Sequence, residues 1–354
     1  MRDMLKKMNK NTKSNLITYG IVIAAFIIMQ TLISTGSISS LMEGLMVPLC
    51  IYIILAVSLN LVVGILGELS LGHAGFMCVG AFTSAFFSKC MRDVITIAPL
   101  RFILALLIGM AVAAVFGIII GIPVLRLKGD YLAIVTLAFG EIIKNLVNVL
   151  FIGKDSNGFH FSTKDVMDLN MEADGTVLVN GPQGITGTPK DSTFLIGVIL
   201  ITLFIVINMI NSRDGRAIMA IRDNRIAAES VGINVTKYKL MAFTVSAALA
   251  GAAGVLYAHN LSTLTANTNN FGYNMSINIL VFVVLGGIGS IRGSMIAAVI
   301  LTLLPELLRG LSDYRMLIYA IVLILMMLFN WSPKAIEWRE KYLSFGKKKK
   351  EAVK

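Results

Sequence analysis

Residues 100–122 read LRFILALLIGMAVAAVFGIIIGI, an apolar run that contains a single charged side chain, Arg101. A helix needs roughly 20 apolar residues to cross the hydrocarbon of a bilayer, and this run is long enough. Comparable runs recur along the chain, which is 56% hydrophobic and only 14% charged. So few charged side chains cannot coat a water-soluble globule of 354 residues. The sequence therefore predicts an integral membrane protein.

The apolar runs predict an all-α, polytopic fold with about ten transmembrane helices. The candidate spans lie near residues 17–35, 45–66, 70–88, 100–122, 131–152, 193–210, 240–258, 274–291, 294–309 and 315–331. An even number of spans places both termini on one side of the membrane. Gly72, Gly75 and Gly80 suit a broken or re-entrant helix in the third span, because backbone buried in protein can leave the helix at membrane depth.

The charge pattern predicts the orientation, because cytoplasmic loops carry an excess of Lys and Arg. With the N-terminus inside, most of the basic residues behind the formal charge of +11 face the cytoplasm. They lie in two tails, 1–15 and 336–354, in a loop at about 211–239, and in short connections at Arg126 and Arg292. A loop at about 153–192 is rich in acidic residues and is predicted to be external. The transmembrane domain then covers 16–335, and its flanking basic residues suit membrane lipid rather than nucleic acid.

The cytoplasmic loop contains a predicted short helix over residues 222–232, which read RDNRIAAESVG. Asp223 or Asn224 can serve as its N-cap, because these side chains accept hydrogen bonds from the first backbone amides. Gly232 is placed to end the helix, because glycine readily adopts the left-handed conformation that follows many helices.

The same helix has the pattern of a docking element. Its small residues Ala227 and Ala228 leave a shallow surface that can seat in a groove on another protein, and Ile226 and Val231 provide apolar anchors. A helix that merely connects two spans has the same pattern, so spacing alone leaves both interpretations open.

Several motifs in sequence order resemble one known family. GRAIMAIRDN and AAESVGIN in the cytoplasmic loop closely resemble the coupling loop of branched-chain amino acid ABC transporter permeases, the M-type subunit in particular. Four further motifs agree with that family: LSLGHAGF at 69–76, GDYLAIVTLAFGE at 129–141, GPQGITG at 181–187 and GGIGSIRG at 286–293. Together the motifs extend the resemblance from about residue 45 to 330.

The resemblance implies a permease subunit of an ABC importer in a bacterial cytoplasmic membrane, moving branched-chain amino acids or a related small polar solute inward. It implies three kinds of partner: a second permease in a heterodimer, two ATP-binding subunits and an extracytoplasmic solute-binding protein. The residues implied to form the ATPase-coupling helix are Arg222, Asp223, Asn224, Ala227, Ala228, Glu229 and Gly232.

The sequence itself contains no Gly-x-x-x-x-Gly-Lys-Ser/Thr loop to cradle nucleotide phosphates. We therefore expect no cofactor on this chain, with ATP bound by partner subunits, and no enzymatic activity of its own.

Two ionisable residues, Glu141 and Lys144, lie near the middle of the fifth candidate span. Their spacing of three puts them on one helix face, where they can pair. A charged residue at this depth is costly unless it is satisfied. The pair either lines or gates a polar translocation path or locks two helices together structurally, and the sequence leaves both readings open.

Four residues of the third span, Ser70, Gly72, His73 and Gly75, are further candidates for the translocation path or gate. They can form unwound backbone that faces a substrate, as interrupted transporter helices do. Alternatively, the glycines permit close helix packing. His73 has no other ligand at metal spacing, so we expect a hydrogen-bonded structural histidine and no metal site.

The alternative function is a self-sufficient secondary transporter or channel, in which Glu141 would carry a coupling proton. The docking helix and the lack of other acids expected to be buried argue against it. An enzyme is a weaker alternative still, because the three histidines, His73, His160 and His259, are scattered along the chain.

Overall fold

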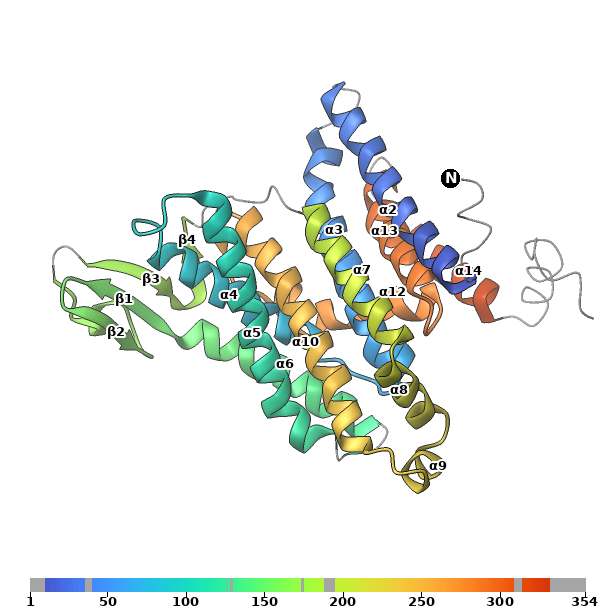
Figure 1. Ribbon diagram of the computed structural model, residues 1–354. Helices are drawn as coiled ribbons and strands as arrows, with labels where there is room; N and C mark the ends of the chain where they lie inside the picture. Colours follow the sequence, from blue (N-terminus) through green and yellow to red (C-terminus); the bar gives the residue numbers. More distant parts are fainter. Residues whose placement is uncertain are drawn as a thin grey trace, which may run out of the picture.

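The computed structural model describes residues 10–35, 40–125, 127, 130–172, 175–187, 195–308 and 314–331. Most of these residues form helices, which pack into one elongated bundle (Figure 1). The longer helices are α2 (Lys10–Ser34), α3 (Ser40–Asn60), α4 (His73–Cys90), α5 (Ala98–Val124), α6 (Asp130–Val149), α7 (Leu195–Asn211), α10 (Val235–Asn260), α12 (Tyr273–Gly286), α13 (Ile291–Leu307) and α14 (Arg315–Trp331). Shorter helices are α8 (Arg213–Asp223), α9 (Arg225–Ser230) and α11 (Thr268–Phe271).

Helix α10 lies at the centre of the bundle, in contact with α3, α4 and α5. Glycines allow its close approach to α4. A Cβ atom added to Gly80 would lie 2.3 Å from the carbonyl oxygen of Gly251, and one added to Gly254 would lie 2.0 Å from that of Met77. Small residues let membrane helices come this close, where packing and backbone contacts replace the hydrophobic effect as the stabilising force.

Within the described residues, four helices are long and apolar enough to cross a membrane: Gly44–Leu66, Ala98–Val124, Tyr131–Val149 and Val235–Asn260. The pair α7 and α8, bent by 68°, would make a fifth if it formed one span. The predicted count of about ten spans is therefore not confirmed. Helix α12 illustrates the reason, because its 14 residues extend over only about 21 Å.

The third predicted span, 70–88, begins outside any helix. Helix α3 continues into a π-helix, η1 (Leu61–Leu66), which ends at Gly67 in the left-handed conformation with φ of 80°. Residues 67–72 are then non-helical, and α4 starts at His73. The break therefore lies at the start of the predicted span, next to Gly72. The prediction is wrong for Gly75 and Gly80, which lie within the continuous helix α4.

The prediction of an all-α fold is wrong for the loop at about 153–192. Strands β1 (Phe151–Asp155), β2 (Gly158–Ser162) and β3 (Thr176–Asn180) form an antiparallel sheet in the order β2-β1-β3. Strand β4 (Ile185–Thr186) pairs with β5 (Thr263–Leu264), and short 3-10 turns cover Met167–Leu169 and Gly181–Gln183. Figure 1 shows the three-stranded sheet projecting from the bundle at the opposite end from α9.

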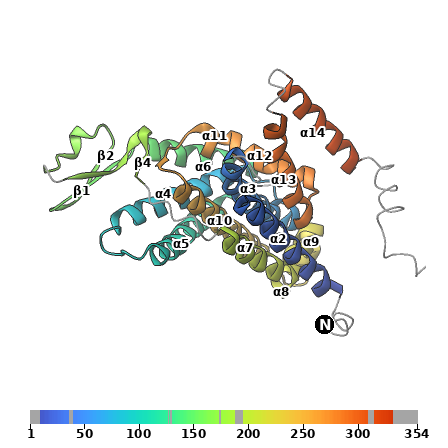
Figure 2. The ribbon, with the colours of Figure 1, turned by 90° about the horizontal axis from the view of Figure 1, so that it is seen from above.

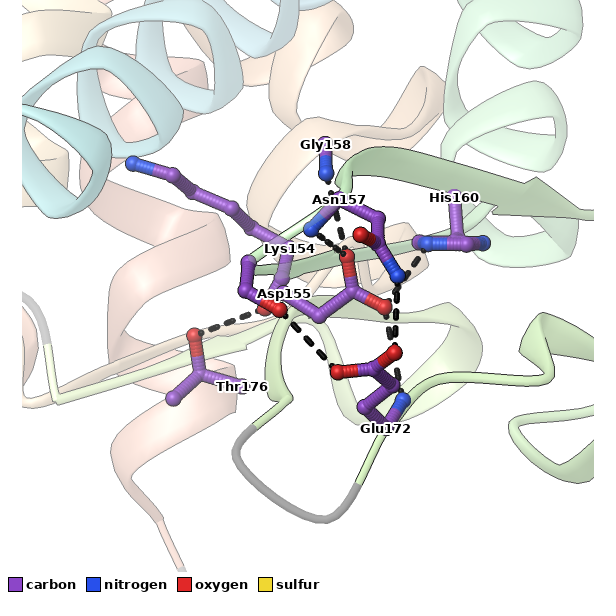
Figure 3. A network of polar contacts seen from close by, with 8 residues as sticks. Lys154, Asp155, Asn157, Gly158, His160, Glu172 and Thr176 are labelled. Carbon is purple, nitrogen blue, oxygen red and sulfur yellow. Dashed lines mark hydrogen bonds and ion pairs between the residues drawn. The ribbon is translucent and has the colours of Figure 1, made fainter.

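Asp155 organises the turn between β1 and β2 (Figure 3). Its Oδ1 accepts hydrogen bonds from the amides of Asn157 and Gly158, at 2.9 and 3.0 Å, and its Oδ2 lies 2.9 Å from Nε2 of His160. Glu172 continues the network, since its amide donates to Asp155 and its carboxylate accepts from Asn157. This aspartate is buried by the turn, and its side chain replaces backbone partners that the turn cannot provide.

The predicted basic tail at 336–354 lies outside the described residues, and the tail at 1–15 is described only from Lys10 onward. Arg126, on the cytoplasmic side in the predicted orientation, also lies outside them.

Candidate functional site

The predicted helix over 222–232 is two helices rather than one. Arg222 and Asp223 end α8, and Asn224 is extended, with φ of −156° and ψ of 105°. The prediction of one helix is therefore wrong at its start, because a continuous polar-apolar pattern does not reveal a single extended residue between two helical segments.

Both predicted caps of α9 are present. The side chain of Asn224 accepts a hydrogen bond of 3.0 Å from the amide of Ala227, so Asn224 rather than Asp223 is the N-cap. Gly232 follows the helix with φ of 84°, and its amide donates to the Glu229 carbonyl at 3.0 Å. The amide of Ile233 donates to the Ala228 carbonyl at 3.1 Å, which completes a Schellman motif.

Helix α9 has one anchored face and one open face. Ala228 is 3% exposed and packs in a small cluster with Ile221 and Val235, so it holds α9 to its neighbours instead of offering a docking surface as predicted. Ile226 and Val231 are 79% and 76% exposed. These two apolar side chains therefore stand free on the surface of the single chain, as docking anchors would.

Arg222 connects the end of α8 to the broken region between α3 and α4. Its Nη1 donates a hydrogen bond of 3.0 Å to the carbonyl oxygen of Gly64, in the π-helix. A Cβ atom added to Gly67 would lie 2.6 Å from Cγ of Arg222, so only glycine leaves room for the arginine side chain. π-Helices are rare and occur frequently at functional sites, so this contact joins two unusual elements.

A buried ion pair makes a second connection to the same region. The ammonium group of Lys239, near the N-terminal end of α10, contacts the carboxylate of Glu68. The two side chains are only 7% and 17% exposed. The non-helical segment 67–72 is thus held by α10 as well as by α8.

Asn60 ties a third element to this place. Its side-chain oxygen accepts from the amide of Gly289 at 2.9 Å, and its side-chain nitrogen donates to Oγ of Ser294 at 3.1 Å. Gly289 belongs to the tight turn between α12 and α13, where its φ of 84° requires a glycine-like conformation. The region from Asn60 to Gly72, which we call the junction, is therefore bonded to α8, α10 and the α12–α13 turn.

The glycines at the start of α4 serve close packing. A Cβ atom added to Gly72 would lie 2.4 Å from the Thr136 carbonyl oxygen, and one added to Gly75 would lie 2.7 Å from Cα of Gly140. Helices α4 and α6 are therefore in near backbone contact here, and this arrangement leaves no room for a substrate beside these two glycines.

His73 and Ser70 lie inside the same packed region. Nε2 of His73 lies 2.6 Å from Oγ of Ser58, and the imidazole is buried, as expected for a hydrogen-bonded structural histidine. Oγ of Ser70 is buried without a hydrogen-bond partner among the described residues.

Glu141 and Lys144 form the predicted pair, with Nζ 2.5 Å from Oε2. Each also bonds to a second segment. Nζ of Lys144 donates to Oγ1 of Thr268 at 3.2 Å, and Oε1 of Glu141 accepts from the amide of Tyr273 at 2.8 Å, where α12 begins. The pair therefore joins α6 to α11 and α12.

Sequence reasoning missed Asn60, Glu68 and Lys239. A charged residue at each end of an apolar run was the available signal for the ion pair, but nothing in the sequence indicates which ends meet. Arg222 was selected for its place in a motif. Its partner is the backbone carbonyl of Gly64, and the sequence cannot single out this carbonyl because every residue has a backbone carbonyl.

Comparisons with known proteins agree with the motifs. The family model for the branched-chain amino acid transport system permease component matches residues 41–329. The high-affinity branched-chain amino acid transport system permease protein LivM of Escherichia coli is 37% identical over 298 residues, covering 81% of this chain and 67% of LivM.

The ribose import permease protein RbsC of Escherichia coli is 28% identical over 290 residues, covering 78% of this chain and 81% of RbsC. The probable branched-chain amino acid transport permease protein LivM of Methanocaldococcus jannaschii is 23% identical over 276 residues, covering 69% of this chain and 74% of that protein. No solved structure matches the chain.

Proposed function

Because the chain belongs to the family of branched-chain amino acid transport permease components, and is thus a permease subunit of an ABC importer, we propose that it is the M-type half of a permease pair. In this role it forms a heterodimer with a second permease and imports branched-chain amino acids or a related small polar solute. Its similarity to permeases whose names specify branched-chain amino acid transport supports this cargo.

The proposed assembly supplies what this chain lacks. Two ATP-binding subunits provide the energy from the cytoplasmic side, and a solute-binding protein delivers the cargo from outside. We propose that the chain lies in a bacterial cytoplasmic membrane with both termini inside, an orientation that the basic loop around α8 and α9 supports.

The observation that carries the mechanism is that α9 has one surface exposed for a partner and another packed against α8 and α10. Its open face exposes Ile226 and Val231, which provide apolar anchors for a groove on an ATP-binding subunit. Its other face is packed against α8 and α10, and these helices hold the junction through Arg222 and Lys239. A displacement of α9 by the ATPase therefore moves the junction.

The junction, in turn, controls elements within the bundle. It is continuous with α3 and α4 and is bonded through Asn60 to the α12–α13 turn. In many transporters, interrupted helices form the substrate site, and access alternates when one group of helices rocks against another around that site. Alternating access would thus arise from movement at the break, driven from the cytoplasmic surface, without covalent chemistry on this chain.

The experiment is ATP-driven uptake into proteoliposomes that contain the permease pair, its ATP-binding subunits and the binding protein. Variants Val231→Ser and Glu229→Gln should retain membrane insertion and ATP hydrolysis but import less amino acid per ATP hydrolysed. Met167→Ser is the control, because Met167 is 86% exposed and belongs to the loop that carries the three-stranded sheet rather than to α9. Uptake at the control level in both variants of α9 would remove the coupling assignment.

A further inference from the structure

One face of α6 carries polar side chains at membrane depth. This helix is among those long and apolar enough to span a membrane, over Tyr131–Val149, and Glu141 lies at its middle. The Glu141 side chain is 25% exposed even though it is paired with Lys144. Asn145, one turn farther along the same face, is also exposed.

A neighbouring helix continues this polar surface. On α12, Asn274 is half-buried and Asn278 is exposed, and their spacing of four residues places them on one face. Helices α6 and α12 are in contact, and the hydrogen bond from the Tyr273 amide to Glu141 joins the two polar faces. Figure 2 shows α6, α11 and α12 together along one edge of the bundle.

The adjacent face of α6 has the opposite character. Ile142, Leu146 and Val149 are 63%, 58% and 50% exposed, and all three are apolar. That face suits lipid. Amide and carboxylate groups exposed to hydrocarbon lose hydrogen bonds to water without replacement, so the polar face does not suit lipid. One helix therefore separates two environments, a lipid on one side and a polar one on the other.

We propose that Glu141, Asn145, Asn274 and Asn278, the polar strip, line this chain's wall of a water-filled translocation pathway that the second permease subunit completes. The inference rests on the proposed function and assigns a surface to it. The strip would face a partner of matching polarity across the path, and the apolar face beside it would remain in lipid.

The chemistry of the polar strip also indicates a cargo class. Asparagine amides donate and accept hydrogen bonds without net charge, so they can contact both the carboxylate and the ammonium group of an amino acid. The charges of Glu141 and Lys144 neutralise each other at 2.5 Å. The pathway wall therefore offers polarity with no net charge, which fits a net-neutral zwitterion and disfavours a free anion or cation.

Cysteine accessibility tests the inference in the assembled transporter. The native thiols of Cys50, Cys78 and Cys90 are first replaced by alanine, and single cysteines are then introduced as Asn145→Cys, Asn278→Cys and, for the lipid-facing control, Ile142→Cys. A charged, membrane-impermeant thiol reagent requires thiolate in contact with water. We expect the two strip positions to react at least about tenfold faster than the control, and excess leucine to slow them.

Equal rates at the strip and control positions, or no reaction at either strip position, would overturn the inference. ATP-driven uptake by the cysteine-free complex is measured in parallel. If the strip positions react with the reagent but the complex shows no ATP-driven uptake, the polar strip is in contact with water and the proposed importer function is wrong. A failure of the polar strip is thus distinguishable from a failure of the proposed function.

Discussion

Replacing Lys239 by methionine should destabilise the protein strongly, because it leaves the Glu68 carboxylate without its partner. Among the described residues, Lys239 is the one side chain bonded to this carboxylate, and Glu68 is only 17% exposed. Removing one member of a buried ion pair costs roughly 3–5 kcal/mol. The Lys239→Met variant should lose stability on that scale.

The double variant Glu68→Gln with Lys239→Met separates the two contributions. Both charges are absent, so the penalty for an unpaired buried carboxylate disappears, and stability should return to within about 1–2 kcal/mol of the parent protein. The control is Lys237→Met, an exposed position on the first turn of the same helix, where a change of no more than about 0.5 kcal/mol is expected.

Thermal unfolding in a mild detergent provides the assay. Cys50 and Cys78 are buried, so a thiol-reactive fluorescent dye reports their exposure as the protein unfolds. The unfolding midpoint of Lys239→Met should fall by about 5–10 °C relative to Lys237→Met. Equal midpoints for these two variants, or a double variant as unstable as Lys239→Met, would refute the buried-pair argument.

Three further predictions concern local structure. Asn224→Ala removes the N-cap of α9 and should cost about 1 kcal/mol, seen as faster amide hydrogen exchange in α9 with unchanged exchange in α10. Gly232→Ala should lower the free energy of unfolding by about 1–2 kcal/mol, because its φ of 84° is unfavourable for alanine even though no atom lies within 4 Å of the added methyl group. Gly197→Ala is the control, because Gly197 lies in a helix and is equally open, and this variant should not be destabilised. Thermal unfolding compares the two variants. Burial acts to raise the pKa of Asp155, but hydrogen bonds from the Glu172 and Asn157 amides and from His160 hold this pKa below its ordinary value of 3.8. The ionised Asp155 therefore stabilises the three-stranded sheet above pH 3.8, and this stabilisation is lost as the pH falls through the lower pKa of the folded protein. Hydrogen exchange in β1 should accelerate in that lower pH range in the parent protein but not in Asp155→Asn.

Local signals in the sequence predicted local structure well. Asn224 and Gly232 were expected to cap a helix, and both do, because capping depends on residues within one turn. Of the three glycines that predicted a break, Gly72 ends the non-helical segment 67–72, whereas Gly75 and Gly80 lie within the continuous helix α4. The pairing of Glu141 with Lys144 followed from their spacing on one helix.

Long-range partners could not be predicted in the same way. Arg222 and Gly64 are 158 residues apart, and Lys239 and Glu68 are 171 apart, so their contacts depend on how whole helices pack. The three-stranded sheet was also missed. Its strands have five residues each, within a loop of mixed polarity, and so short a pattern gives little periodicity to read.

The most direct test of the importer assignment is purification of the tagged chain in a mild detergent, followed by identification of the proteins that accompany it and by measurement of ATPase activity. The account predicts that ATP-binding subunits and a second, different permease co-purify, and that substitution of Ile226 and Val231 by aspartate releases the ATP-binding subunits but not the second permease. A chain that purifies alone and transports solute in liposomes without ATP would contradict the account and identify a self-sufficient transporter instead.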